Sequence, residues 1–400
     1  MSFFEWAVLI WILFAFLPAP LCVGLGMLKI VIAHRRKGNQ AVSDKFPEVE
    51  ILIPIKGILP DQEKILESLL QQDYPNYQVM FLIESHDDPA SLLVDGLCTR
   101  FPHSREVITG TAESCGQKNH NLVAGIRCLN KNTEIIVFCD SSNMADADWL
   151  NRITAPIRTG AVEAVTTFRA FDPRPETIWG VSQAIYAAFL LLLIVNKPKP
   201  WGGATAIARR TFNRLRVIEE WSRNVIDDLT LGNILDRAGI KILMDPRCVL
   251  RSPLPSQTLR GFVHYMDRQI LFPKWTNPII WAMTVVFYLD LALAILVTTI
   301  VAIMFLFGLV GPFLGWLSCV FLVLVFSVVT LLRKVNPFHI PVGSWLASFF
   351  PFIFVTGFVF LRSVFRNYID WHGTKYWPGK GGVVLSAEPA DPVLGAGRAD

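Results

Sequence analysis

The sequence predicts an α/β domain with a mostly parallel sheet, flanked in the chain by transmembrane α-helices. Apolar residues make up 52% of the 400 residues and the mean hydropathy is +0.42, both high for a soluble protein. The longest apolar runs lie near the two ends of the chain. Between about residues 45 and 275, short buried-type strands alternate with amphipathic helices, which is the pattern of a parallel sheet.

The first apolar run, residues 6–28, is long enough to cross a bilayer of roughly 30 Å. It is followed by Arg35, Arg36 and Lys37, and the positive-inside rule places such an end in the cytoplasm. A signal peptide would carry its charges before the run and a cleavage site after it. We therefore expect residues 1–38 to be an anchor that leaves the following domain facing the cytoplasm.

A second apolar block, residues 279–364, predicts up to three more transmembrane helices. Four crossings would put the tail, residues 365–400, outside, but basic residues favour the inside: Arg362, Arg366, Lys375 and Lys380. One segment is therefore expected to be re-entrant or interfacial, and 344–361, which contains Pro351 and Gly357, is the weakest span. Asp290 is either a helix–helix hydrogen-bonding group or a functional proton or lipid head-group site.

A further apolar run, residues 178–195, is also long enough to cross a membrane. A crossing there would place the motifs before and after it on opposite sides. We expect a helix that lies on the cytoplasmic membrane surface.

The central region, residues 45–275, reads as strands at 49–57, 77–85, 133–140 and 163–170, with a first amphipathic helix at 61–72. Ligands of such sheets bind at the carboxyl ends of the strands. The polar residues there are Lys56, Glu84, Asp87, Asp88 and Asp140.

Several classes of site are disfavoured by the sequence. There is no glycine-rich phosphate loop, so an anionic ligand needs a metal, a lysine or a helix N-terminus. The cysteines form no CxxC pair and are expected to be reduced: 22, 98, 115, 128, 139, 248 and 319. A net charge of +4 argues neither for nor against nucleic acid, and no nucleic-acid partner is expected. The oligomeric state is left open.

Five motifs resemble membrane-bound family 2-type glycosyltransferases, and most of all the ceramide glucosyltransferase branch. In chain order they are LIPIKG (52–57), QQDYPNYQVMFLIESHDDPA (71–90), GQKNHNL (116–122), FCDSSN (138–143) and IDDLTLGNIL (226–235). The resemblance covers roughly residues 45–275 and implies a Rossmann-like GT-A fold.

A nucleotide-sugar donor carries a diphosphate, which Mg²⁺ or Mn²⁺ neutralises as the leaving group departs. By this resemblance Asp140 is the metal ligand, and the small residues after it leave room for phosphate and metal. The usual second aspartate is replaced by Ser142. The alternative is that Asp140 caps the next helix, a role that Asp146 could also fill.

Donor contacts are implied for residues near the strand ends. Glu84 is expected at the uridine or ribose, with Asp88 as a helix cap, and Lys56 closes the first strand. Lys118 and Asn121 match the donor-contacting segment of the family. A solvated surface lysine is the alternative for Lys118.

Asp227 and Asp228 begin a helix, where the helix dipole favours carboxylates. A general base must deprotonate the acceptor hydroxyl. The match to the family implies that Asp228 is this base, and Asp227 stands where the family has glutamate. A capping role is compatible with catalysis.

Two further segments resemble the family less closely. PWGGA (200–204) resembles an acceptor-side loop with Trp201, Gly202 and Gly203, where Trp201 stacks on the sugar or anchors the loop at the membrane. The (Q/R)xxRW signature is degenerate and offers either Arg268 with Gln269 or Lys274 with Trp275. Arg268 is preferred for a diphosphate contact. The tail run YIDWHGTKYW (368–377) echoes a family motif, with His372 in place of arginine.

The resemblance implies an inverting enzyme that transfers a hexose, with glucose preferred, from a UDP-sugar to a hydroxyl of a lipid in the bilayer. Ceramide is the preferred acceptor, and diacylglycerol or a hopanoid are alternatives. A processive polysaccharide synthase is the competing enzyme. A UDP- and lipid-binding scaffold without activity is the competing non-enzyme, motivated by the incomplete aspartate motif.

Overall fold

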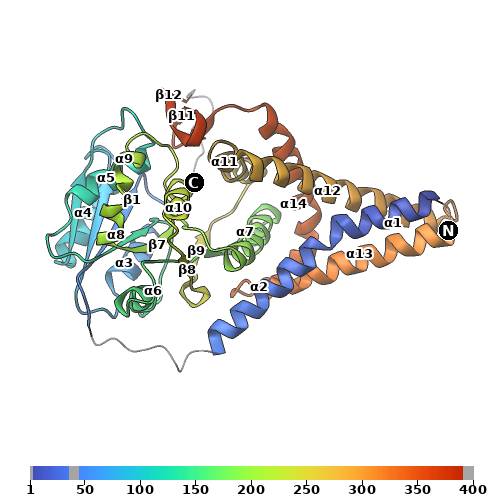
Figure 1. Ribbon diagram of the computed structural model, residues 1–400, viewed down its shortest axis with the longest axis horizontal. Helices are drawn as coiled ribbons and strands as arrows, with labels where there is room; N and C mark the ends of the chain where they lie inside the picture. Colours follow the sequence, from blue (N-terminus) through green and yellow to red (C-terminus); the bar gives the residue numbers. More distant parts are fainter. Residues whose placement is uncertain (1–2, 36–44, 391–400) are drawn as a thin grey trace.

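The computed structural model describes residues 3–35 and 45–390. An α/β domain lies at one end, and long helices extend away from it (Figure 1). Arg36 and Lys37 of the predicted cytoplasmic cluster, and residues 391–400 of the tail, lie outside the described residues.

The main sheet has seven strands in the order β3-β2-β1-β4-β7-β5-β8. Only β7 is antiparallel to its neighbours, so the predicted mostly parallel sheet is confirmed. The strands are β1 (Val49–Ile55), β2 (Tyr77–Ile83), β3 (Ser104–Ile108), β4 (Ile135–Cys139), β5 (Ala164–Thr166), β7 (Ala204–Ala208) and β8 (Ile242–Met244). Continuous apolar strands form because both faces of this sheet are covered.

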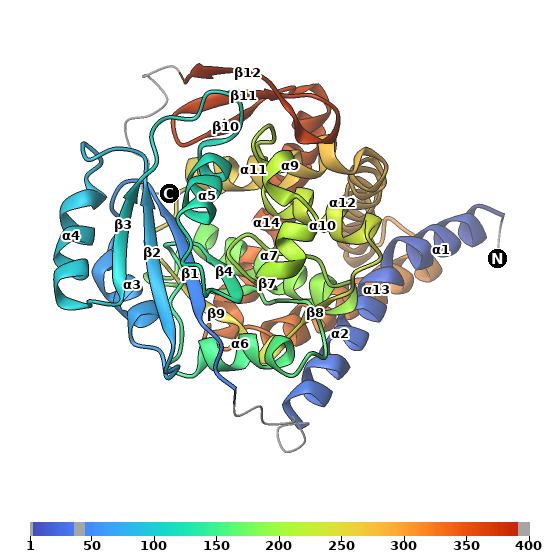
Figure 2. The same cartoon turned by 60° about the vertical axis from the view of Figure 1, so that its left-hand side comes forward.

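Helices cover the two faces of the sheet, as Figure 2 shows. They are α3 (Gln62–Leu70), α4 (Ala90–Arg100), α5 (Gln117–Arg127), α6 (Trp149–Arg158), α8 (Arg209–Arg214), α9 (Val217–Trp221) and α10 (Asp228–Arg237). Side chains alternate along β1: Leu52 packs with Leu122 of α5, whereas Ile51 belongs to the core that includes Leu66 of α3. The carboxyl ends of β1, β2 and β4 are thereby held at one edge.

The segment predicted as a strand at 163–170 forms two strands. β5 ends at Thr166, and β6 (Arg169–Pro173) pairs with β9 (Leu250–Leu254) in a separate two-stranded sheet. The backbone changes partner between them, because Thr167 N–H bonds to Ala204 while the Phe168 carbonyl accepts from Leu250. Arg169 therefore starts a new strand beside the main sheet.

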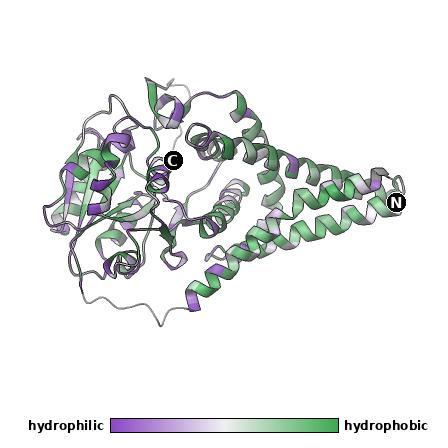
Figure 3. Ribbon diagram, in the orientation of Figure 1, coloured by the Kyte–Doolittle hydropathy of each residue, from purple (hydrophilic) through white to green (hydrophobic). Residues whose placement is uncertain are grey.

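Among the described residues, five helical segments are long and apolar enough to cross a membrane: residues 5–35, α7, α12, α13 and α14. The first comprises α1 (Phe3–Phe16) and α2 (Pro18–Arg35); the others are α7 (Ile178–Asn196), α12 (Pro278–Leu306), α13 (Pro312–Arg333) and α14 (Val342–Phe365). Figure 3 shows the hydrophobic character of α1, α12 and α13. Trp11 Nε1 donates to Asp290 Oδ1 at 2.8 Å, which confirms the helix–helix interpretation of Asp290.

The helix α7, predicted as interfacial, is largely enclosed by protein. It packs against α2 and α14, and Asn196 Nδ2 donates to the Cys22 carbonyl. Ser182 Oγ donates to the Ser348 carbonyl of α14. This packing joins the α/β domain to the long helices.

Both ends of α14 lie against parts of the chain that contact the α/β domain. Before it, Asn336 Nδ2 donates to the Phe171 carbonyl. After it, Arg366 pairs with Asp267 of α11 (Leu259–Thr276). The chain then forms a three-stranded sheet, β10 (Ile369–Trp371), β11 (Thr374–Pro378) and β12 (Val384–Pro389), and the Gly382 carbonyl accepts from Val225 N–H. In Figure 1, α14 stays beside the domain while α1, α12 and α13 extend beyond it.

Candidate active site

Asp140 directly follows the buried strand β4, at the carboxyl edge of the sheet. Its backbone N–H donates to the Gly203 carbonyl at 3.2 Å. Asn143, fully buried, donates to the same carbonyl and accepts from Ser252. The polar residues after the strand thus hold the loop in place. The Asp140 carboxylate itself contacts Lys118, while α6 begins later, at Trp149, so Asp140 does not cap that helix.

Lys118, in the first turn of α5, occupies the centre of the site. Its Nζ lies 2.8 Å from Asp140 Oδ1, 3.0 Å from Asp227 Oδ2 and 3.3 Å from the Gly202 carbonyl. Only 15% of the side chain is exposed, so the interpretation as a solvated surface lysine is wrong. Burial alone lowers the pKa of Lys118, but the Asp140 and Asp227 carboxylates outweigh it and raise this pKa above its ordinary value.

Asp228 is the first residue of α10 and lies beside this cluster. Its Oδ2 accepts from Gly202 N–H at 3.1 Å, and its Oδ1 accepts from Leu229 N–H at 2.7 Å. Burial, followed by the Asp227 carboxylate, raises the pKa of Asp228 to about 7, against the opposing effect of Lys118. A carboxylate with a pKa near neutrality is suited to accept a proton at physiological pH.

The loop before β7 approaches the carboxylates with its backbone. A Cβ on Gly202 would lie 2.3 Å from Asp227 Oδ2, and one on Gly203 would lie 2.1 Å from the Trp201 ring. Trp201 is 9% exposed as a residue, and its ring packs on that of Phe168 with centroids 4.9 Å apart. This buried ring is not a membrane-surface anchor.

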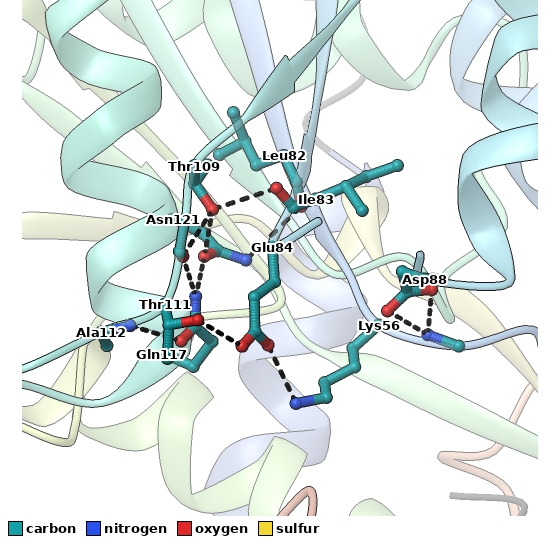
Figure 4. A network of polar contacts seen from close by, with 12 residues as sticks. Lys56, Leu82, Ile83, Glu84, Asp88, Thr109, Thr111, Ala112, Gln117 and Asn121 are labelled. Atoms are coloured by element: carbon teal, nitrogen blue, oxygen red, sulfur yellow. Dashed lines mark hydrogen bonds and ion pairs between the residues drawn. The ribbon is translucent and has the colours of Figure 1, made fainter. Parts of the chain in front are cut away.

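Lys56 after β1 and Glu84 after β2, both predicted to contact the donor, form an ion pair (Figure 4). Lys56 Nζ lies 3.0 Å from Glu84 Oε2, and Thr111 donates to Glu84 Oε1. Asp88 accepts from Gly57 N–H and from Ala90 N–H at the start of α4, so it has the structural role predicted for it.

Asn121 lies deeper, at 4% exposure. Its Oδ1 accepts from Thr109 and from Gln117 (Figure 4). These bonds connect α5 to the segment after β3 and orient the turn that carries Lys118. A direct donor contact by Asn121 stays a prediction.

The two residue pairs that could match the degenerate (Q/R)xxRW signature, Arg268 with Gln269 and Lys274 with Trp275, lie in different environments. Lys274 Nζ contacts the carbonyls of Ser363, Val364 and Arg366 at 2.8–3.1 Å, so it caps the C-terminus of α14. Arg268 and Gln269 lie in the middle of α11, partly exposed. Their donor contact stays a prediction.

The tail contributes a contact that sequence reasoning missed. Tyr376 of β11 accepts at its hydroxyl from Gln117 N–H, at the N-terminus of α5. Asn224 pairs with Val383 in an isolated bridge. The weak YIDWHGTKYW motif was the only signal, and it does not reveal the partner.

A divalent cation would have to be held jointly with a donor. Within the described ranges, no group of three or more His, Cys, Asp or Glu side chains could hold a metal ion. Asp140 Oδ1 contacts Lys118, and the carboxylate is 29% exposed. Mg²⁺ commonly uses one or two carboxylates with substrate phosphates, so Asp140 fits such a site only when a diphosphate completes the shell.

Two solved structures are similar to this chain at low sequence identity. The mannosyltransferase PcManGT of Pyrobaculum calidifontis, solved with GDP-mannose and Mn²⁺, is 17% identical, covers 90% of this chain and 98% of that chain, and has a TM-score of 0.46. Glucosyl-3-phosphoglycerate synthase of M. tuberculosis is 14% identical over 57% of this chain and 77% of that chain, with a TM-score of 0.33.

A curated relative, a ceramide glucosyltransferase of Komagataella phaffii, is 33% identical over 78 residues. That segment is 20% of this chain and only 15% of the relative. The description of the matching family model is "Glycosyl transferase family 21", and the model covers residues 16–384, which include the whole α/β domain and most of the flanking helices. This chain therefore belongs to glycosyl transferase family 21.

Proposed function

We propose that this glycosyltransferase moves a hexose, preferably glucose, from a UDP-sugar to a lipid hydroxyl, preferably that of ceramide, with inversion. The observation that carries the proposal is the contact of Asp228 with Gly202, beside the Lys118–Asp140–Asp227 cluster. A base of raised pKa thus lies next to a cationic group at the ligand-binding edge of the sheet. The short homology to a ceramide glucosyltransferase supports the choice of acceptor.

In this reaction Asp228 takes the proton from the acceptor hydroxyl, whose oxygen attacks the anomeric carbon. The bond from that carbon to the diphosphate breaks, and UDP leaves with the electron pair. Lys118, whose Nζ lies 2.8 Å from Asp140 Oδ1, is proposed to stabilise the developing charge on the diphosphate. A single displacement of this kind inverts the anomeric configuration.

Mg²⁺ or Mn²⁺, bound by Asp140 and the donor phosphates, would supply further neutralisation of the leaving group. Glu84 and Lys56, joined at the ends of β2 and β1, are proposed to contact the nucleoside part of the donor. Neither role requires a second carboxylate at position 142, where this chain has Ser142.

For membrane placement, we propose that the α/β domain and the tail both face the cytoplasm, with segment 5–35, α12 and α13 crossing. Both ends of α14 lie against parts of the chain in contact with the domain, which supports a helix that does not cross. Three crossings then leave the tail inside, in accord with its basic residues. The site thereby stays at the surface from which a lipid hydroxyl arrives.

The test is a transfer assay with purified protein in detergent. A panel of radiolabelled UDP-hexoses is offered with ceramide, diacylglycerol or a hopanoid, each with Mg²⁺, Mn²⁺ or EDTA. Asp228→Asn is compared with Asp236→Asn, a change on the same helix at an exposed residue that pairs with Lys199.

A labelled lipid from wild type and Asp236→Asn, but not from Asp228→Asn, is the expected result. A long water-soluble polymer would replace the proposal with a polysaccharide synthase. UDP binding without release of sugar to any acceptor would replace it with a non-catalytic scaffold.

A further inference from the structure

We propose that Arg169, at the start of β6, binds a neutral oxygen of the acceptor's head group, with Tyr265 as a second hydrogen-bond donor. The inference rests on the proposed lipid acceptor and adds a specificity-determining contact to it. Arg169 belongs to none of the five motifs, and its chemistry is not used in the proton transfer.

The Arg169 guanidinium is held by aromatic rings. Its Cζ lies 4.6 Å from the ring centroid of Phe171, 5.5 Å from that of Trp201 and 5.7 Å from that of Tyr265. These rings come from β6, the loop before β7 and α11. Cation–π contacts from three elements fix the guanidinium plane without using its N–H groups as hydrogen-bond donors.

In the part of the chain that the structure describes, the buried Arg169 Nε and Tyr265 hydroxyl have no hydrogen-bond partner. Over residues 3–35 and 45–390, no hydrogen bond or ion pair involves the Arg169 side chain, and its Nε is buried. The Tyr265 hydroxyl is also buried and without a hydrogen-bond partner in that range, and the residue is 6% exposed. Buried donors without acceptors are rare in proteins and indicate an external partner, such as a ligand. Arg169 itself remains partly exposed and reachable.

The position of these groups points to the acceptor. Trp201 precedes Gly202, whose backbone N–H contacts Asp228. On the other side, Tyr265 lies 6.1 Å from Tyr186 of α7, between their ring centroids. Arg169 is thus between the proposed base and the helices that join the domain to the long apolar bundle.

The charges around the base decide which head group fits. Asp140, Asp227 and Asp228 oppose the single ammonium of Lys118, a formal excess of two negative charges when all are ionised. The donor diphosphate would bring a divalent cation to offset this excess, whereas a phosphate head group near Asp228 would arrive without one and be repelled. A neutral amide carbonyl or second hydroxyl accepts from Arg169 without that cost.

The test measures binding and turnover separately. A fluorescent short-chain ceramide is titrated by polarisation in the presence of UDP, and UDP affinity is measured by calorimetry. The variants are Arg169→Met and Tyr265→Phe. The matched control is Arg251→Met, because Arg251 also packs over a ring, Phe338 at 4.5 Å, but is paired with Asp172.

Arg169→Met is expected to weaken ceramide binding roughly 10- to 100-fold, the range for a charge-assisted hydrogen bond. Tyr265→Phe, which removes only the hydroxyl, is expected to weaken it about 3- to 10-fold. UDP affinity should change by less than about twofold, as should both affinities in Arg251→Met. If Arg169→Met does not fold, Tyr265→Phe alone decides.

The inference is overturned if Arg169→Met binds ceramide as tightly as wild type does. Where Arg169→Met does not fold, unchanged ceramide binding by Tyr265→Phe has the same consequence. An equal loss of UDP affinity does so too, because it indicates a structural role. Tighter, Arg169-dependent binding of a lipid phosphate would overturn the neutral head group. If the wild-type protein binds ceramide but transfers no sugar, the proposed function is refuted. The inference about Arg169 is then judged from the binding measurements alone.

Discussion

Replacement of Gly202 by alanine tests whether the carboxylate cluster works through its close backbone contact. The added Cβ would lie 2.3 Å from Asp227 Oδ2 and 2.8 Å from Lys118 Nζ. The φ angle of Gly202 lies outside the left-handed region, so the effect is steric rather than conformational.

The size of the effect follows from these distances. An ordinary carbon–oxygen contact is about 3.4 Å, so either the loop or the Asp227–Lys118 pair must move by about 1 Å. Overpacking of this kind costs about 1–3 kcal/mol of folding free energy. A shift of about 1 Å between reacting groups lowers kcat by about 100-fold. Activity is therefore expected to fall far more than stability.

The assay compares kcat for sugar transfer with the thermal unfolding midpoint in detergent. The control is Gly96→Ala, in the middle of α4, where a Cβ meets nothing within 4 Å. That change should leave kcat unaltered and stabilise the protein by up to about 1 kcal/mol. A folded Gly202→Ala enzyme that keeps kcat within about threefold of wild type would refute the reasoning.

Three other outcomes are expected. Because a raised pKa of about 7 leaves Asp228 protonated in acid, kcat/KM for the acceptor should rise with pH through about 7. Native Asp228 also binds its proton more tightly than the unfolded chain does, so the free energy of unfolding should fall from about pH 4 to 7. Asp228→Asn should abolish that fall, which unfolding measured as a function of pH would check. Lys118→Met leaves carboxylates unpaired and should cost about 3–5 kcal/mol of folding free energy. In the presence of UDP, whose diphosphate completes the shell, Mn²⁺ should recover part of this loss; unfolding scans with UDP that show no further response to Mn²⁺ would contradict a cation site at Asp140. Trp11→Phe removes the donor to Asp290 and should cost about 0.6–1.7 kcal/mol in detergent, with no change in UDP affinity by calorimetry.

Sequence alone was enough for features that depend on near neighbours along the chain. The buried runs of β1, β2 and β4 predicted a parallel sheet, because both of its faces must be covered. The position of Asp140 after β4, and of Asp228 at the start of α10, followed from strand and helix ends. Apolar length likewise predicted the long helices.

Tertiary structure decided which partner each polar residue meets. Lys118 was expected to contact a donor, yet its position between Asp140 and Asp227 depends on three segments distant in sequence. Lys274 fitted a signature but caps α14, about 90 residues away. Arg169 lay within a single predicted strand, 163–170, and was not identified as a site residue. The change of strand partner after Thr166 leaves no pattern in the local sequence that would predict it. Periodicity reports which face is buried, whereas ion pairs and ring contacts depend on long-range packing that no local window contains.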